Sequence, residues 1–186
     1  MNKSIAQTNT SRKTLDLTYI ALGAVLIAIC SWISIPATVP FTLQTFAVAF
    51  VLLALGGKRG TISIVIYILL GAIGIPVFAQ FSSGFGVLLG TTGGYIIGFI
   101  LMGLVYWAFT QFISRKLWMQ VLASVLGLAA CYAFGTFWFM EVYSRNSGAI
   151  GLSAALAWCV IPFIIPDLIK LILAVVIATR VSFVIK

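Results

Sequence analysis

Asp167 and Lys170 are opposite charges, three residues apart, in a segment from Trp158 to Thr179 that is otherwise almost wholly apolar. In hydrocarbon a single charge is disfavoured by at least ~2.5 kcal/mol on insertion scales, so such residues usually face a bundle interior or a cavity and mark a solute path. At this spacing the two side chains share one face of a helix. We therefore expect the functional site at this pair.

The chemistry of the pair suits a small neutral ligand. A carboxylate accepts hydrogen bonds and an ammonium group donates them, so Asp167 and Lys170 together match a ligand with adjacent N–H and C=O groups. Pro162 and Pro166 leave carbonyls of the same helix without their usual donors. The alternative is an ion pair that neutralises itself and only fixes helix packing. A buried pair is weak evidence for stability, which favours the ligand interpretation.

Residues near the ends of other apolar segments could complete the site. Gln44 and Tyr95 are amphipathic groups beside loops, and Phe41 and Phe78 could line its apolar part, because pockets are mostly apolar with a few placed polar groups. Aromatic residues at membrane boundaries are also interface anchors, so both roles stay open for Tyr95.

The composition predicts an integral membrane protein. Of 186 residues, 62% are hydrophobic and 8% charged, against roughly 45–50% and 25% in soluble domains. The net charge of +8 comes from short cationic pairs between apolar runs, which favours topology signals over a nucleic-acid interface. We therefore expect a lipid bilayer as partner and no nucleic acid.

Six apolar segments are candidates for membrane-spanning helices, since a span needs about 20 predominantly apolar residues. They cover residues 17–35, 41–55, 61–78, 93–113, 118–143 and 162–182. Sorting the cations by alternate loops leaves Arg145 alone on one side; the other side receives Lys3, Arg12, Lys13, Lys58, Arg59, Arg115, Lys116, Arg180 and Lys186. By the positive-inside rule both termini are cytoplasmic. The prediction is a single all-α, multi-pass domain over residues 1–186.

The segment 76–92 is expected to face outward. It contains glycine, serine, phenylalanine and glutamine but no charge. A loop of this length is usually functional or disordered, and its aromatic content argues against disorder. We interpret it as a lid or as the wall of an outward-facing pocket.

The sequence lacks the residues that several kinds of chemistry require. The chain has no histidine, and Cys30, Cys131 and Cys159 show no C-x-x-C spacing, so no metal site or disulfide framework is indicated. No phosphate-binding Walker motif is present. We therefore expect that the protein has no cofactor, no bound metal and no catalytic residues, and that it is not an enzyme.

Five short segments taken in order resemble one family. They are Ile35-Pro36 with Val39-Pro40-Phe41-Thr42-Leu43-Gln44, then Gly57-Lys58-Arg59-Gly60, Gly71-Ala72-Ile73-Gly74-Ile75-Pro76-Val77-Phe78, Thr92-Gly93-Gly94-Tyr95, and Pro166-Asp167-x-x-Lys170. Together they resemble the BioY family, the biotin-specific substrate-binding (S) components of energy-coupling-factor (ECF) vitamin transporters. The resemblance covers nearly the whole chain.

The resemblance implies a six-helix subunit of the cell membrane that captures biotin from outside and associates with a transmembrane coupling protein and two ATPase subunits. It also implies that the small residues Ala24 and Ala28 dock on the coupling protein; on the residues alone, packing within the bundle is the alternative. Biotin's ureido ring would meet Asp167 and Lys170, and its carboxylate would meet backbone N–H groups near Gly93 and Gly94. The reverse orientation stays open.

Two other functions compete with a biotin-binding subunit. One is a proton-coupled secondary transporter with Asp167 as coupling site, which a chain of 186 residues without an evident inverted repeat disfavours. The other is an intramembrane enzyme, for which no nucleophile–base pairing can be assembled.

Overall fold

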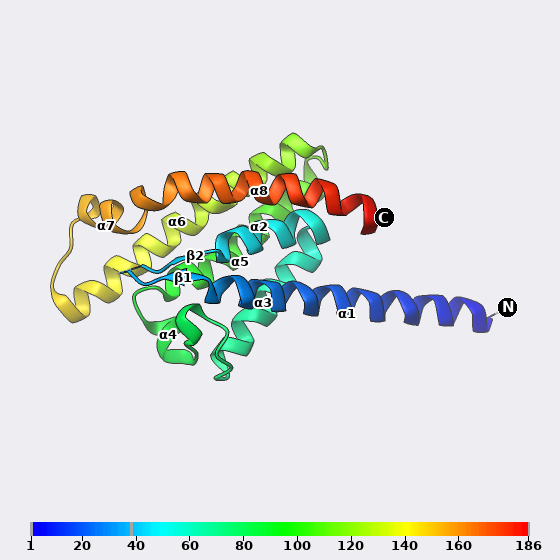
Figure 1. Ribbon diagram of the computed structural model, residues 1–186, viewed down its shortest axis with the longest axis horizontal. Helices are drawn as coiled ribbons and strands as arrows, with labels where there is room; N and C mark the ends of the chain where they lie inside the picture. Colours follow the sequence, from blue (N-terminus) through cyan, green and yellow to red (C-terminus); the bar gives the residue numbers. More distant parts are fainter. Residues whose placement is uncertain (1, 38, 186) are drawn as a thin grey trace.

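The computed structural model describes residues 2–37 and 39–185, with side chains over 13–37 and 39–181. The predicted cytoplasmic side chains of Lys3, Arg12 and Lys186 therefore lie outside the described part. Within it the chain is mostly helical (Figure 1). The elements are α1 (Asn2–Trp32), β1 (Ser34–Ile35), β2 (Phe41–Thr42), α2 (Gln44–Leu55), α3 (Gly57–Ala72), the 3-10 turn η1 (Ala79–Phe81), α4 (Phe85–Leu89), α5 (Gly93–Phe112), α6 (Leu117–Ser147), α7 (Leu152–Cys159) and α8 (Ile161–Ile185).

Four helical segments in the described residues are long and apolar enough to cross a membrane: Lys13–Trp32, Gly93–Phe112, Leu117–Ser147 and Leu152–Val181. The helices α2 and α3 have 12 and 16 residues, or about 18 and 24 Å at 1.5 Å per residue, short of the roughly 30 Å of a hydrocarbon core. The structure therefore agrees with the predicted class, a multi-pass helical membrane protein. Helix length by itself supports four of the six predicted spans.

Several helix ends differ from the prediction for local reasons. The segment predicted as a helix over 61–78 is helical from Gly57 to Ala72, because Gly56 and Gly74 have φ of 83° and 103° and Pro76 lacks an N–H. The segment predicted over 41–55 becomes helical only at Gln44, because β2 pairs antiparallel with β1, Ile35 opposite Phe41. The predicted loop 76–92 contains η1 and α4, and α7 was not predicted.

The side chains of α8 explain its position. Residues at helical spacing are buried on one face: Asp167, Lys170, Leu171, Ala174 and Ala178. The opposite face exposes Ile165, Ile169, Ile172 and Val176. A helix with an apolar face outside and charges inside suits lipid on one side and a polar interior on the other.

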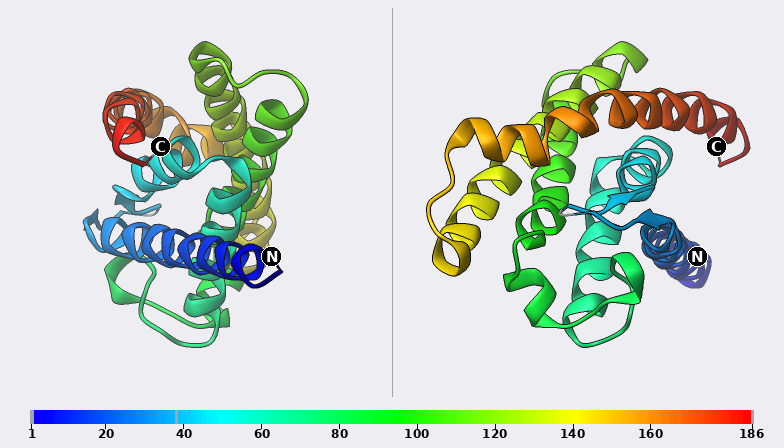
Figure 2. Two further views of the ribbon diagram at one scale, coloured as in Figure 1. Left: turned by 90° about the vertical axis from the view of Figure 1, so that its right-hand side faces the viewer. Right: turned by 60° about the vertical axis from the view of Figure 1, so that its left-hand side comes forward.

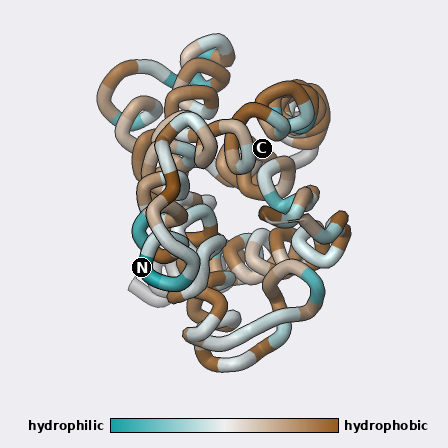
Figure 3. The backbone as a smooth tube through the Cα atoms, turned by 90° about the vertical axis from the view of Figure 1, so that its left-hand side faces the viewer, coloured by the Kyte–Doolittle hydropathy of each residue, from teal (hydrophilic) through white to brown (hydrophobic). Residues whose placement is uncertain are grey.

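The helices form a bundle in which α5 packs along α6, and α2 lies between α1 and α8 (Figure 2). The backbone is hydrophobic over most of its length (Figure 3). The start of α1 and the end of α8 point toward the same end of the bundle, and the β1–β2 hairpin lies nearer the other end (Figure 1). On α8 the Asp167–Lys170 pair faces this hairpin, since Lys170 contacts Thr42 of β2.

Candidate solute-binding site

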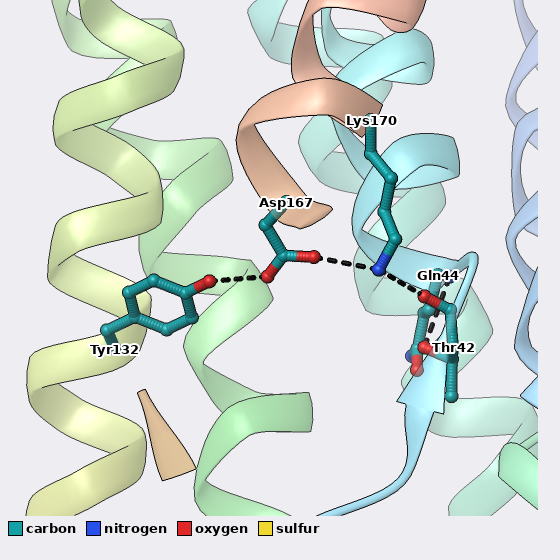
Figure 4. Close-up of polar contacts among 5 residues, drawn as sticks. All are labelled: Thr42, Gln44, Tyr132, Asp167 and Lys170. Carbon is teal, nitrogen blue, oxygen red and sulfur yellow. Dashed lines mark hydrogen bonds and ion pairs between the residues drawn. The ribbon is translucent and has the colours of Figure 1, made fainter. Parts of the chain in front are cut away.

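Asp167 and Lys170 form a buried ion pair on α8, with Lys170 Nζ 2.8 Å from Asp167 Oδ1 (Figure 4). Their side chains are 4% and 7% exposed. The second carboxylate oxygen, Oδ2, accepts a hydrogen bond of 2.5 Å from the Tyr132 hydroxyl on α6. Two helices thus hold the carboxylate, and each of its oxygens has one protein donor.

The β1–β2 hairpin holds the ammonium group. Lys170 Nζ donates to the Thr42 carbonyl oxygen at 2.7 Å, and it lies 3.9 Å from the centre of the Phe41 ring, within the range of a cation–π contact. An ammonium group has three N–H donors. Asp167 and Thr42 accept from two of them, so one N–H has no hydrogen-bond acceptor among the described residues.

A cavity of about 310 Å³ opens beside the pair, at the lower end of the usual range for small-molecule pockets, roughly 300–1,000 Å³. Its polar lining comprises Thr42, Gln44, Thr45, Gln80, Ser82, Thr92, Tyr95, Tyr132, Asp167 and Lys170. Its apolar lining comprises Val39, Pro40, Phe78, Ala79, Val87, Ile96, Phe99, Leu128 and Phe163, with Cys131 and Cys159. The charged pair therefore faces a solute-sized hollow.

The segment 76–92 forms one wall of this cavity. Phe78, Gln80, Ser82 and Val87 all line it. Gln80 has a positive φ of 57°, a conformation uncommon outside glycine. Because the segment also contains η1 and α4, it has secondary structure of its own and is not a structureless loop.

Three further predicted residues reach the cavity. Gln44 is 5% exposed and donates from Nε2 to the Tyr67 hydroxyl at 2.8 Å. Tyr95 forms a 3.0 Å hydrogen bond with Thr136. Phe78 is fully buried and meets the Tyr67 ring edge to face at 5.6 Å. The structure thus brings Gln44, Phe78 and Tyr95 together with the charged pair.

Three predicted residues do not line the cavity. Phe41 contacts Lys170 and stacks on Phe163 at 5.8 Å, but it is not part of the cavity lining. Gly93 and Gly94 serve close packing, because a Cβ would collide with the Leu88 backbone at Gly93 and with the Trp138 side chain at Gly94. Thr92, one residue earlier, lines the cavity instead.

Ala24 and Ala28 are 2% and 6% exposed and belong to the hydrophobic core. In this arrangement they pack inside the bundle, which was the alternative to docking on a partner. The exposed face of α1 carries Leu22, Val25 and Ile29 instead. Docking of the two alanines on a coupling protein stays a prediction, and it would require side chains that are covered in this arrangement to become accessible.

Tyr132 is a site residue that the sequence did not predict. It is a hydroxyl-bearing residue in the middle of the apolar segment Leu117–Ser147, and such a polar group needs a partner in hydrocarbon. That partner, Asp167, is 35 positions away, so sequence spacing could not reveal the contact. Among the described residues, no group of three or more His, Cys, Asp or Glu side chains could hold a metal ion.

A multi-pass helical bundle with a charged pair facing a solute-sized cavity defines a membrane protein that binds a small solute. The BioY family model matches residues 1–186. The chain belongs to the BioY family.

Relatives and a solved structure agree with this membership. The chain is 41% identical over 158 residues to "Biotin transporter BioY" of Thermotoga maritima, covering 84% of this chain and 89% of the relative. It is 39% identical over 171 residues to "Probable biotin transporter BioY" of Pyrococcus horikoshii, covering 91% and 98%. Its fold matches the crystal structure of the S-component for biotin from an ECF-type ABC transporter, with a TM-score of 0.81, 30% identity and 92% of both chains covered.

Proposed function

We propose that this chain is the biotin-binding S component of an ECF-type uptake transporter, capturing biotin from the extracellular side. One observation carries the proposal: in a member of the BioY family, the buried Asp167–Lys170 pair faces a hollow of about 310 Å³. Such a cavity can enclose a small solute that has both polar and apolar parts.

The chemistry of biotin fits the lining. The ureido ring has two N–H donors and a carbonyl acceptor, which match the free lone pairs of Asp167 and the remaining N–H of Lys170. The sulfur ring and aliphatic tail fit the apolar walls, including Phe78. The carboxylate then lies toward the polar groups of Gln80 and Thr92. The reverse orientation, with Lys170 bound to the carboxylate, is the competing arrangement.

The partners follow from the same assignment. We infer that a transmembrane coupling protein and two ATPase subunits complete the transporter, and that ATP is hydrolysed by those subunits. In addition to the four long spans, α2 and α3 act as two short spans, which makes six. The protein lies in the cell membrane, and both of its termini lie in the cytoplasm. The exposed face of α1, with Leu22, Val25 and Ile29, is available to meet the coupling protein.

The proton-coupled carrier is not favoured. Curated relatives are named biotin transporters, and the similar solved structure is an S-component. Both oxygens of Asp167 already accept protein hydrogen bonds, as expected for a carboxylate held in place for a ligand.

Biotin titration of purified Asp167→Asn tests the proposal. The amide keeps the size of the side chain and removes its charge, and hydrogen bonds to charged groups contribute about 1.5–3 kcal/mol, so the dissociation constant should rise roughly 10- to 100-fold. Asp16→Asn is the matched control, because that carboxylate pairs with Arg59 and does not line the cavity. Unchanged affinity of Asp167→Asn would refute the assigned role.

A further inference from the structure

A second hollow, of about 840 Å³, lies at the end of the bundle away from the biotin cavity. The first cavity takes Gln44 from the start of α2, whereas the second takes Leu53 and Leu55 from its end. Likewise the second hollow contacts α8 at Val175 and Ala178, beyond Lys170. The biotin site does not use this hollow.

The hollow is basic. Lys58, Arg59 and Arg115 line it, together with one acid, Asp16. Asp16 pairs with Arg59 at 2.5 Å. Among the described side chains, Lys58 and Arg115 have no ion-pair partner. Two cations thus face the hollow with their charges uncompensated, which favours an anionic ligand.

Backbone N–H groups add to the positive electrostatic potential of the hollow. The helix α3 begins at Gly57 beside Lys58, and its N-cap is Gly56, which has no side chain to accept from the first-turn N–H groups. These residues all line the hollow, and a helix start attracts anions. On the other side, Gln120 Nε2 donates to the Arg115 carbonyl at 2.7 Å, and the Tyr106 hydroxyl donates to Gln120 Oε1 at 3.0 Å. The turn that carries Arg115 is therefore held in place.

Besides its charged groups, the hollow has neutral polar side chains, Thr110, Gln111 and Thr179 among them, and several apolar ones. Trp107, Leu117 and Val175 line the hollow. Phe112 and Trp118, on either side of Arg115, are 84% and 64% exposed, as expected where a helix link meets the membrane boundary. A ligand for this place therefore has an anionic group and an apolar body.

We propose that this hollow binds the phosphate headgroup of an anionic membrane lipid, with Lys58 and Arg115 as the paired cations and the apolar lining in contact with the start of the acyl chains. Basic pockets between membrane helices are suited to such headgroups. The inference goes beyond biotin binding and stands on a different part of the molecule.

The test uses the full chain in neutral phosphatidylcholine nanodiscs, titrated with phosphatidylglycerol and followed by thermal unfolding and by native mass spectrometry of retained lipid. The double variant Lys58→Gln with Arg115→Gln should weaken phosphatidylglycerol retention by at least about tenfold. The matched control, Lys116→Gln with Arg180→Gln, removes the same charge from exposed residues outside the hollow and should retain the lipid like the unchanged chain.

Further measurements distinguish lipid binding from three alternatives: free phosphate, general surface charge and a protein contact. Inorganic phosphate at the same concentration should not raise the unfolding temperature; an equal rise would assign the site to free phosphate and overturn the lipid proposal. Equal losses of lipid in the two double variants would show general surface charge and also overturn it. The lipid proposal would also be overturned if the variant Lys58→Gln with Arg115→Gln kept its lipid but no longer co-purified with the coupling module. The hollow would then be a protein contact. As a control for folding, both double variants should have the same melting temperature in phosphatidylcholine alone.

Discussion

At the residue scale, the site depends on how completely its two charges are held. Asp167 receives one hydrogen bond at each oxygen, from Lys170 and Tyr132, and Lys170 reaches across to the Thr42 carbonyl. Each group is therefore fixed in orientation while keeping free hydrogen-bonding capacity. Since fixed polar groups lose little conformational entropy on binding, this preorganisation favours affinity.

The Tyr132 hydroxyl should contribute to biotin binding by orienting Asp167. In Tyr132→Phe, Oδ2 loses its donor while the ring remains, and we expect biotin to bind roughly tenfold more weakly, equivalent to about 1.4 kcal/mol. Isothermal titration calorimetry measures this difference. Tyr143→Phe is the control, since the Tyr143 ring stacks on Phe139 at 5.5 Å outside the cavity. Equal affinities for the two variants would show that Tyr132 has no positioning role.

At the element scale, glycines set the distance between α5 and α6. The helix α5 carries Gly94 and Gly98 one turn apart, and α6 carries Gly135. A Cβ at Gly98 would lie 3.2 Å from the Cys131 Cα, and one at Gly135 would collide with the Tyr95 ring. Small residues let membrane helices approach closely. This contact positions Tyr95 and Tyr132 on facing helices of the cavity.

Gly98→Ala should therefore destabilise the helix pair. The added methyl group meets the backbone of α6, which cannot move aside as a side-chain end could, and overpacking costs about 1–3 kcal/mol. Gly86→Ala makes the same chemical change in α4, where a Cβ would have nothing within 4 Å. Unfolding in detergent, followed by circular dichroism, should show a lower midpoint for Gly98→Ala only. Equal midpoints would mean that the α5–α6 contact is not close-packed.

At the scale of the whole molecule, the two hollows lie at opposite ends of one bundle. The biotin cavity adjoins the hairpin and segment 76–92, and the basic hollow adjoins the α2–α3 turn and the α5–α6 link. Cations gather at the second end, which the positive-inside rule assigns to the cytoplasm. With this topology we expect the biotin cavity to face outward, as uptake requires.

Cysteine accessibility checks this orientation. In a background with Cys30, Cys131 and Cys159 replaced by alanine, Ser147→Cys lies at the outer end of α6 and Gln111→Cys near the inner end of α5; both native residues are exposed. A membrane-impermeant maleimide should label Ser147→Cys in intact cells, and Gln111→Cys only after permeabilisation. The opposite pattern would invert the topology and place the biotin cavity inside the cell.

The sequence by itself determined the class of protein and predicted where its binding site lies. Its apolar composition predicted membrane helices, and a carboxylate and an amine at helical spacing in an apolar segment predicted a site at Asp167 and Lys170. Both follow from local free energies, the cost of charge in hydrocarbon and the 3.6-residue helical repeat, which need no knowledge of distant residues.

Only the tertiary structure decided which side chains surround that pair. Tyr132 reaches Asp167 from 35 positions away, Phe41 contacts Lys170 without lining the cavity, and Ala24 packs in the core of the bundle. Since nearly every face of these helices is apolar, hydrophobicity could not tell a face in lipid from a face against another helix. Packing of the complete bundle made that choice, because side-chain shape and the glycines between helices determine which surfaces fit closely.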